Sequence, residues 1–431
     1  MSQGAATSTS IEPLRALRYD QTRVTLSDVI APPYDVITEA HRAALARRCD
    51  YCVVRLELPG SPQEAAGLLH DWRADGVLQR DEQPTIWWHE QRFTGPDGVD
   101  RTRSAFFAAV RLTPYEQGRI RPHEQTHQHV KSARLDLMRA TRTNLSPIFG
   151  LYDDPEGTAH EALAAVASGR PEMAATDEDG TEHRFWAVTD PDAIAAAQIA
   201  LADREILIAD GHHRYETALA YRDEQRQREG DPEGDRPYDF ILMALANLRD
   251  EGLTIFPTHR VVMSKRDVEK GFMSAFDYRE MPAGTPAAAV EAELNEIPSD
   301  IVAFALWRGM DVPPLLCELR DTTRVMMAMP GVPKAVRSVD AAVLEALVLS
   351  PLLGLDGDQF LHTDQVRYVR GLDAATSLVD TGEAGSLFLL RAPTVEQVQA
   401  VAASGRVMPQ KATYFFPKLF SGFLLNPLAD E

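Results

Sequence analysis

Hydrophobic and polar positions along the chain follow both helical and strand spacing, and the two kinds of segment are mixed without a regular strand–helix–strand repeat. Apolar residues recur on one side of 63–79, which is typical of an amphipathic helix. Two strand-like runs, 85–94 and 99–112, flank Gly-Pro-Asp-Gly and predict a β-hairpin. Further strands are predicted at 52–58, 148–152, 184–188, 205–209, 238–248, 253–263 and 408–427, and further helices at 39–48, 132–143, 157–168, 191–201 and 212–228. The predicted fold class is therefore α+β, a mixed α/β chain.

We expect the chain to divide into four parts. Residues 1–10 are small or polar after the initiator, which predicts a disordered tail. Residues 11–115 predict an N-terminal α/β region, and 116–280 carry most of the candidate chemistry. After Pro282 the chain becomes rich in alanine and proline, so 281–431 predict a C-terminal α+β region that returns to the core.

Charge narrows the range of partners. The chain has 44 Lys+Arg against 64 Asp+Glu, a net charge of −20, which disfavours nucleic acid and anionic membranes. No apolar run approaches the roughly 20 residues of a membrane span, and no signal peptide is visible. Three cysteines do not make a disulfide framework, so we expect a cytoplasmic protein, and its expected partners are small molecules. A homodimer is compatible with the sequence. An anionic ligand would need a local concentration of donors.

One such concentration follows a short predicted strand, where Asp210-Gly211-His212-His213-Arg214 opens a long predicted helix. Side chains that can carry a positive charge, here two histidines and an arginine, are unfavourable in the first turn, because the helix dipole favours negative charge at that end. Gly211 lets the backbone turn sharply, and free amides with an arginine fork suit a phosphate. The pattern predicts an anion site in which Asp210 either caps the helix or holds a metal. In the alternative interpretation, Asp210 only caps the helix and Arg214 pairs with a distant acid.

A second cluster is the histidine-rich segment 121–129, which contains an H-E-x-x-H match from His123 to His127. In zinc proteases this spacing places two metal ligands one helical turn apart. The context is poor, because Pro122 would place the motif in a first helical turn at best and no apolar stripe would bury that helix. A second interpretation takes Glu124 as a general base that accepts a proton from a substrate hydroxyl.

Six segments spread over nearly the whole chain resemble the DUF1015 family. They are 27–37 (SDVIAPPYDVI), 53–59 (VVRLELP), 139–152 (RATRTNLSPIFGLY), 208–219 (IADGHHRYETAL), 256–262 (FPTHRVV) and 408–427 (MPQKATYFFPKLFSGFLLNP). The Pro-His-Glu followed by strand, DGHHR and helix is also similar to the ParB/sulfiredoxin superfamily, especially its free serine kinases. The resemblance implies a ParB/sulfiredoxin-like nucleotide-binding core at 116–280 with large insertions.

The resemblance also implies residue roles. In those kinases the turn cradles nucleotide phosphates, and the Pro-His-Glu glutamate acts on the serine hydroxyl. Carried over to this chain, the implied catalytic residues are Glu124, Asp210 and His212, with Asp210 also the Mg²⁺ ligand, and the implied nucleotide-binding residues are Gly211, His213 and Arg214. One departure is the separation of 86 residues between Glu124 and Asp210, which requires an insertion.

The C-terminal segment leaves its role open. Lys411 and Lys418 either add cations to the same pocket or are solvated on a closing strand whose phenylalanines fill the core. Thr413, His123 and Asp35 are the substrate-side candidates, with Asp35 a partner for a substrate ammonium group.

The predicted function is phosphoryl transfer from ATP or ADP, with Mg²⁺, to the hydroxyl of a small substrate, which by the resemblance is free L-serine. The first alternative is a nucleotide-binding switch or adaptor without catalysis. The second is a zinc-dependent hydrolase that uses His123, Glu124 and His127.

Overall fold

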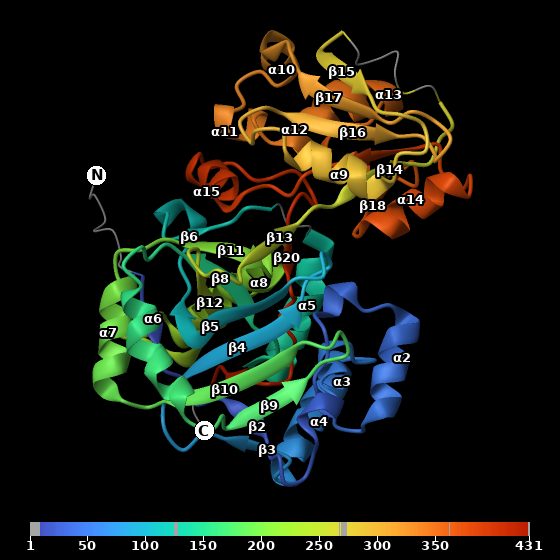
Figure 1. The fold of residues 1–431 in the computed structure, drawn as a ribbon. Helices are drawn as coiled ribbons and strands as arrows, with labels where there is room; N and C mark the ends of the chain where they lie inside the picture. The colour runs from blue at the N-terminus through green and yellow to red at the C-terminus, as the bar shows by residue number, and fades with distance from the viewer. Residues whose placement is uncertain (1–8, 125–127, 267, 269–273, 362, 430–431) are drawn as a thin grey trace. The chain divides into compact units, whose positions relative to one another are not determined.

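The computed structural model of the chain describes residues 9–124, 128–266, 268, 274–361 and 363–429. Contacts divide the chain into two units, shown with their elements in Figure 1. The first unit joins Met1–Thr254 to the C-terminal segment Pro417–Glu431, and the second is Ile255–Phe416. The sequence-based division at 115 and 280 stays a prediction.

A nine-stranded sheet forms the centre of the first unit. Its strands in sheet order are β6 (Ile120–Arg121), β11 (Ile206–Asp210), β8 (Ile148–Tyr152), β12 (Phe240–Asn247), β5 (Asp100–Arg111), β4 (Ile86–Thr94), β10 (Glu182–Val188) and β9 (Met173–Thr176), with β1 (Ile11–Glu12) beside β5. Within the described part of the chain, the parallel pairs of this sheet are β6–β11 and β8–β12, and the other pairs are antiparallel. The first unit also contains two separate two-stranded ladders. They are β2 (Leu17–Tyr19) with β3 (Leu78–Arg80), and β7 (Thr143–Asn144) with β21 (Asn426–Pro427).

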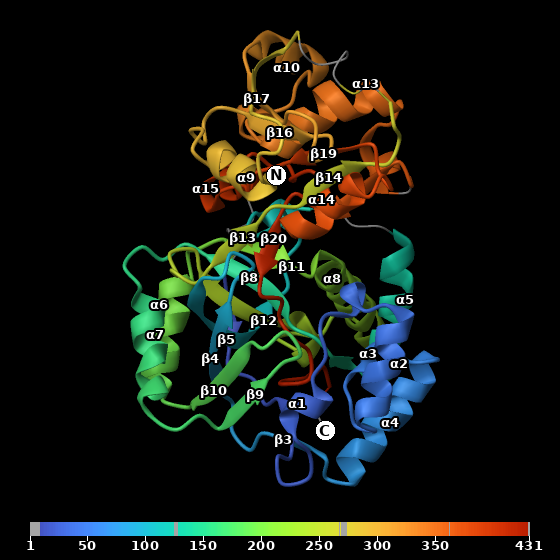
Figure 2. The same ribbon diagram turned by 45° about the vertical axis from the view of Figure 1, so that its right-hand side comes forward.

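The helices of the first unit supply the rest of its core. They are α1 (Leu26–Val29), α2 (Glu39–Arg48), α3 (Val54–Glu57), α4 (Pro62–Ala74), α5 (Gln128–Thr141), α6 (Thr158–Ala164), α7 (Pro191–Leu201) and α8 (His212–Glu229), with the short 3₁₀ turn η1 at Tyr34–Val36. Helices α5 and α8 lie side by side (Figure 2). Leu163 of α6, Leu201 of α7 and Tyr215 of α8 share one core with Trp88 and Ile208 of the sheet.

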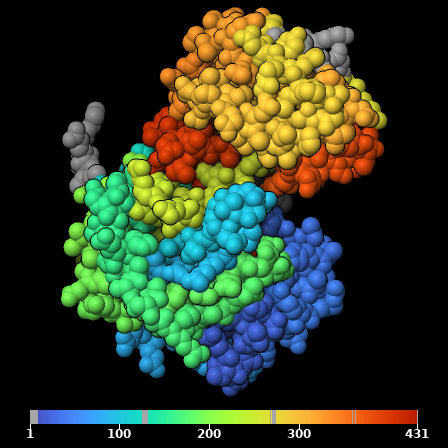
Figure 3. Space-filling view, viewed as in Figure 1, coloured from blue at the N-terminus to red at the C-terminus, as the bar shows by residue number. Residues whose placement is uncertain are grey.

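Local sequence explains where several of these elements begin and end. Helix α7 starts at Pro191 because Asp190 caps it, accepting a hydrogen bond from the Asp192 amide. Helix α8 ends at Glu229 because the next residue, Gly230, has a left-handed backbone, and its amide donates to the carbonyls of Arg226 and Gln227. In Figure 3 the dark blue segment that contains α1 packs against the green segment that contains β9.

The second unit is built on a six-stranded antiparallel sheet. Its strands in order are β15 (Phe276–Glu280), β17 (Leu315–Leu319), β16 (Ala303–Trp307), β19 (Ser386–Leu389), β14 (His259–Val262) and β18 (Val366–Val369), and β13 (Thr254–Phe256) pairs separately with β20 (Tyr414–Phe416). Its helices are α9 (Ala287–Asn295), α10 (Thr322–Ala328), α11 (Lys334–Arg337), α12 (Asp340–Leu344), α13 (Ser350–Leu353), α14 (Leu372–Asp380) and α15 (Val395–Ala403). Val261, Leu294, Trp307 and Leu387 are fully buried in its core.

The mixed α+β class and the hairpin of β4 and β5 are confirmed. The strand predicted at 52–58 is wrong, because Val54–Glu57 forms the short helix α3. A short apolar run does not by itself distinguish a buried strand from a buried helical turn. Within 408–427, only β20 and β21 are strands. Among the described helices, none combines the length and hydropathy that a bilayer crossing requires.

Candidate active site

Two neighbouring parallel strands bring the two sequence clusters together. Strand β6 pairs with β11 so that Ile120 lies opposite Ile206 and Arg121 opposite Leu207. Parallel strands end at the same edge of a sheet. The Pro-His-Glu segment that follows β6 and the Asp-Gly turn that ends β11 therefore emerge side by side, although 86 residues separate Glu124 from the turn.

The contact between the clusters is made by two buried histidines. The backbone amide of His123 donates to Nε2 of His212 at 3.2 Å, and Nδ1 of His123 donates to the carbonyl of Ile208 at 2.5 Å. The two rings are 4.7 Å apart, and His123 is only 1% exposed. Burial lowers the pKa of His123 to about 4 and holds the pKa of His212 well below its ordinary value. Both rings are therefore neutral at pH 7.

This neutrality corrects one element of the sequence interpretation. His212 does not add a positive charge to the first turn of α8, because its ring is desolvated and faces the ring of His123. It acts instead as a hydrogen-bond acceptor, so its own proton is on Nδ1. The pair holds the backbone of the Pro-His-Glu segment against the turn.

Asp210 is bound by two cations. Its Oδ2 accepts from Nη2 of Arg214 at 2.5 Å, and its Oδ1 accepts from Nζ of Lys418, which the C-terminal segment supplies. Burial opposes the charge of Asp210, but Lys418 and Arg214 outweigh it and keep its pKa below the ordinary value. The carboxylate is therefore ionised, and a Mg²⁺ ion at Asp210 would have to displace one of these cations. Asp210 does not cap the helix either, since no side-chain cap bonds the start of α8.

Arg214 is folded back beneath the turn. It is 8% exposed, and besides Asp210 its guanidinium donates to the carbonyl of Pro147. Arg214 thus forms an internal ion pair, as in the alternative interpretation of the sequence. Its partner is Asp210 of the same turn and not a distant acid. Gly211 has φ of 99°, and a Cβ there would approach Nε and Nη2 of Arg214 to 3.0 Å. Only glycine meets both requirements without strain.

The start of α8 is where an anion would bind. Gly211 precedes an 18-residue helix, and no side chain of the described residues caps its first amides. The first N–H groups of a helix have no intrahelical acceptor and carry a partial positive charge. The turn of Gly211 brings these donors to the edge of the sheet at which the Pro-His-Glu segment also follows its strand. Glu124 and His213 are both half-buried.

A second layer of charged residues was missed from the sequence. Arg134 of α5 donates to the carbonyl of Glu57 at 2.7 Å and to its carboxylate Oε2, and its guanidinium lies 3.8 Å from the ring centroid of Tyr34. Glu57 is 2% exposed, and its Oε1 has no hydrogen-bond partner. Tyr34, Asp35 and Glu57 all raise the pKa of Arg214, so the layers form one electrostatic cluster. The isolated glutamate in the apolar run VVRLELP was the available signal.

The family described as "Protein of unknown function (DUF1015)" matches residues 11–299, about two thirds of the chain. The chain belongs to the DUF1015 family. None of the curated proteins matches it.

Solved structures similar to this DUF1015 chain include three with low TM-scores. A free serine kinase in complex with AMP is 14% identical with a TM-score of 0.35, and the alignment covers 75% of this chain and 91% of that one. A conserved hypothetical protein from Pyrococcus furiosus is 16% identical with a TM-score of 0.33, over 75% and 94% of the two chains. SbnI with a C-terminal truncation, from Staphylococcus aureus, is 11% identical with a TM-score of 0.35, over 75% and 87%.

The part matched by the DUF1015 family contains both clusters and the second layer, whereas Lys418 lies outside it. Asp35 is exposed on η1, within electrostatic reach of Arg214. Lys411 and Thr413 belong to the second unit, so their predicted part in this site stays a prediction.

His127 lies outside the described residues, so the structure does not place the pair His123 and His127. Among the residues that the structure does describe, no group of three or more His, Cys, Asp or Glu side chains is arranged to hold a metal ion.

Proposed function

We propose that this protein is a small-molecule kinase that transfers a phosphoryl group from ATP or ADP to the hydroxyl of a small substrate, with free L-serine the leading acceptor. The observation that carries the proposal is the parallel pairing of β6 with β11. It supports the proposal because the Pro-His-Glu segment and the start of α8, whose first amides no described side chain caps, follow neighbouring strands at one sheet edge.

Phosphoryl transfer mainly requires positioning and charge stabilisation, and this edge supplies both. The first amides of α8 bind the phosphate oxygens, while Lys418 contributes a cation beside the turn. Glu124 accepts the proton of the substrate hydroxyl as its oxygen bonds to the transferred phosphorus and the bond to the leaving phosphate oxygen breaks. The hydrogen bond between His123 and His212 holds the Pro-His-Glu segment against the turn. Because both rings are neutral, the pair adds no positive charge there.

Mg²⁺ is the predicted metal, and it supplies charge neutralisation on nucleotide phosphates. Both oxygens of Asp210 are engaged by Arg214 and Lys418, so Asp210 does not fit a direct magnesium ligand in this arrangement. We therefore assign no step of the reaction to the metal.

The test is direct. Purified protein is incubated with ATP or ADP, Mg²⁺ and L-serine, and O-phosphoserine is measured by phosphorus NMR and mass spectrometry. Glu124→Gln removes the base and keeps the shape, so we expect a loss of about 100-fold or more in turnover. Glu116→Gln is the matched control, because Glu116 is an exposed glutamate in the preceding turn and its loss leaves turnover unchanged. Absence of product with every nucleotide and hydroxy amino acid, or full activity of Glu124→Gln, contradicts the proposal.

The second candidate is a nucleotide-binding switch that does not turn over substrate. The double neutralisation of Asp210 favours it, because the turn then presents no carboxylate to a metal. Calorimetry that detects ADP or ATP binding, in a preparation without phosphotransfer to any tested acceptor, supports this candidate over the kinase.

A further inference from the structure

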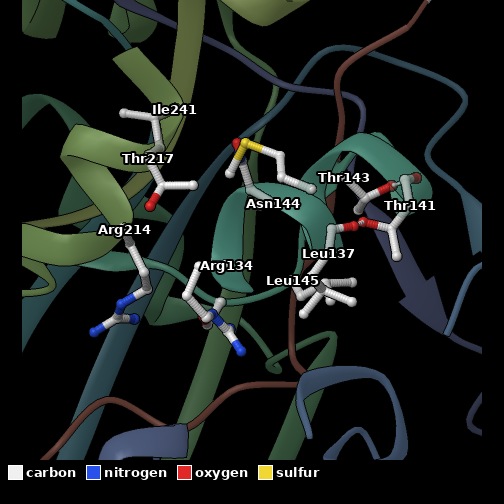
Figure 4. Close-up of a pocket in the computed structure, with 11 residues that line it drawn as sticks. Arg134, Leu137, Thr141, Thr143, Asn144, Leu145, Arg214, Thr217 and Ile241 are labelled. Carbon is white, nitrogen blue, oxygen red and sulfur yellow. Dashed lines mark hydrogen bonds between the residues drawn. The ribbon is translucent and has the colours of Figure 1, made fainter. Parts of the chain in front are cut away.

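A small pocket lies between the end of α5 and the first turns of α8. Figure 4 shows Arg134 and Arg214 with their guanidinium groups on the same side of it. The cavity has a volume of about 30 Å³, which is room for roughly two or three water-sized atoms by the usual volume per atom. It is therefore the size of one small polar group and too small for a nucleobase.

Both arginines that line the pocket are held rigidly from outside it. The contacts of Arg134 are with Glu57 and the ring of Tyr34, and those of Arg214 are with Asp210 and Pro147. These bonds use two of the five N–H groups of each guanidinium. Each arginine is thus oriented before a ligand arrives, with donors still unused.

Asn144 of β7 adds a third donor to the lining. Its Oδ1 accepts from the amide of Leu242 at 3.2 Å and from Nδ2 of Asn426 at 3.1 Å, which fixes the orientation of the amide group. Its Nδ2 is buried without a hydrogen-bond partner, and the residue as a whole is only 3% exposed. A buried amide donor without an acceptor is unfavourable by about 1–3 kcal/mol unless a ligand or water accepts from it.

The charge around the pocket also points to an anion. Among the described residues that line it there is no aspartate or glutamate, although the chain carries a net charge of −20. Arg134 is balanced by Glu57, but Arg214 and Lys418 share the single carboxylate of Asp210. The lining of the pocket therefore presents two cationic side chains, Arg134 and Arg214, to a ligand.

We propose that this pocket binds a small oxyanion, and that the oxyanion is the carboxylate of the acceptor substrate. A planar carboxylate suits two guanidinium groups and an amide donor, and its two oxygens fill a cavity of about 30 Å³. The same chemistry is offered by a phosphate, which is larger by one or two oxygens. The identity of the acceptor rests on the proposed function, whereas the binding of an oxyanion does not.

The first experiment tests the pocket without reference to catalysis. Sodium acetate at about 100 mM, compared with sodium chloride at equal ionic strength, should raise the Tm of the wild type by about 2–4 °C if its Kd is about 10 mM. Arg134→Lys keeps the charge beside Glu57 but loses the planar fork, so the rise should disappear. Arg139→Lys changes an exposed arginine of the same helix that does not line the pocket, and it should retain the rise.

The second experiment identifies the source of the oxyanion by calorimetry. L-serine should bind at least about tenfold more tightly than serinol, which replaces the carboxylate with a hydroxymethyl group, and Arg134→Lys should remove that difference while leaving the Kd of ADP unchanged. Arg139→Lys, at an exposed position of the same helix that does not line the pocket, should retain the preference.

The outcomes separate this inference from the proposed function. An acetate effect that is absent from the wild type, or equal in Arg134→Lys, overturns the pocket as an oxyanion site. A loss of ADP affinity in Arg134→Lys with unchanged serine binding overturns the acceptor assignment and identifies a phosphate of the donor. An acetate effect that depends on Arg134, in a protein without phosphotransfer, upholds the pocket and overturns the kinase.

Discussion

The buried ring of His123 makes the stability of the first unit depend on pH, and this dependence can be calculated. Burial lowers the folded-state pKa to about 4 from the ordinary value of 6.5, so the folded protein keeps the ring neutral. Between these values the unfolded chain binds a proton that the folded chain does not. Stability is therefore lost as the pH falls from about 6.5 to about 4, and below that the contribution is constant.

The size of the effect follows from the two pKa values. At about pH 5, a ring with a pKa of 6.5 unfolded and about 4 folded lowers the free energy of unfolding by about 2 kcal/mol relative to about pH 7.5. Desolvation is the main cause, the hydrogen bond to Ile208 and the charge of Asp210 oppose it, and Lys418 adds to it.

The assay compares the wild type with His123→Asn, in which the amide nitrogen replaces Nδ1 as donor to Ile208. Urea unfolding is followed by tryptophan fluorescence at both pH values; four of the five tryptophans lie in the first unit. Between about pH 7.5 and about pH 5, the free energy of unfolding of the wild type should fall by about 2 kcal/mol more than that of His123→Asn. His212 is present in both proteins, and burial, the main cause of its lowered pKa, acts in both.

His70→Asn is the control, because His70 is exposed on α4, and its stability difference from the wild type should show no comparable change. A difference for His123→Asn that stays constant between the two pH values, or that grows in favour of the wild type at the lower one, refutes the reasoning. It would mean that the ring is solvated or charged in the folded protein.

The remaining predictions concern glycines. Gly211→Ala should lower stability by about 1–2 kcal/mol and weaken nucleotide binding about tenfold or more, because φ is 99° and the new Cβ meets Arg214. Gly230→Ala, with φ of 74° and open space at the other end of α8, should cost about 1 kcal/mol and spare nucleotide binding in calorimetry. Gly252→Ala should lose more than about 3 kcal/mol in urea unfolding, because its Cβ would lie 2.1 Å from the carbonyl oxygen of Thr102. Gly67→Ala, in open space on α4, should instead raise the free energy of unfolding by about 1 kcal/mol. Equal changes in stability for Gly252→Ala and Gly67→Ala would contradict the clash between the new Cβ at 252 and Thr102.

Local sequence patterns determined much of the secondary structure. The hairpin of β4 and β5, the strand β8 and the helix α7 all have the predicted type, because turn residues, capping residues and apolar spacing act within a few residues of one another. The start of α8 at Gly211 is likewise a local matter of backbone sterics. Where the local signal was ambiguous, as at α3, the prediction failed, since only burial against distant residues decides between a strand and a helical turn.

The composition of the site was decided by tertiary structure. Nothing in the spacing of Glu124 and Asp210 reveals that β6 and β11 pair in parallel, because strand pairing depends on the whole sheet. Lys418 reaches Asp210 from 208 residues away, and Arg134 reaches Glu57 from 77.

Burial likewise reversed what residue type suggests, and it makes His212 a neutral acceptor instead of a cation. By itself the sequence determined which residues were available and what each short segment prefers. The fold alone decided which of them meet and in what state of charge, because long-range pairing and desolvation are properties of the surroundings and not of the residue.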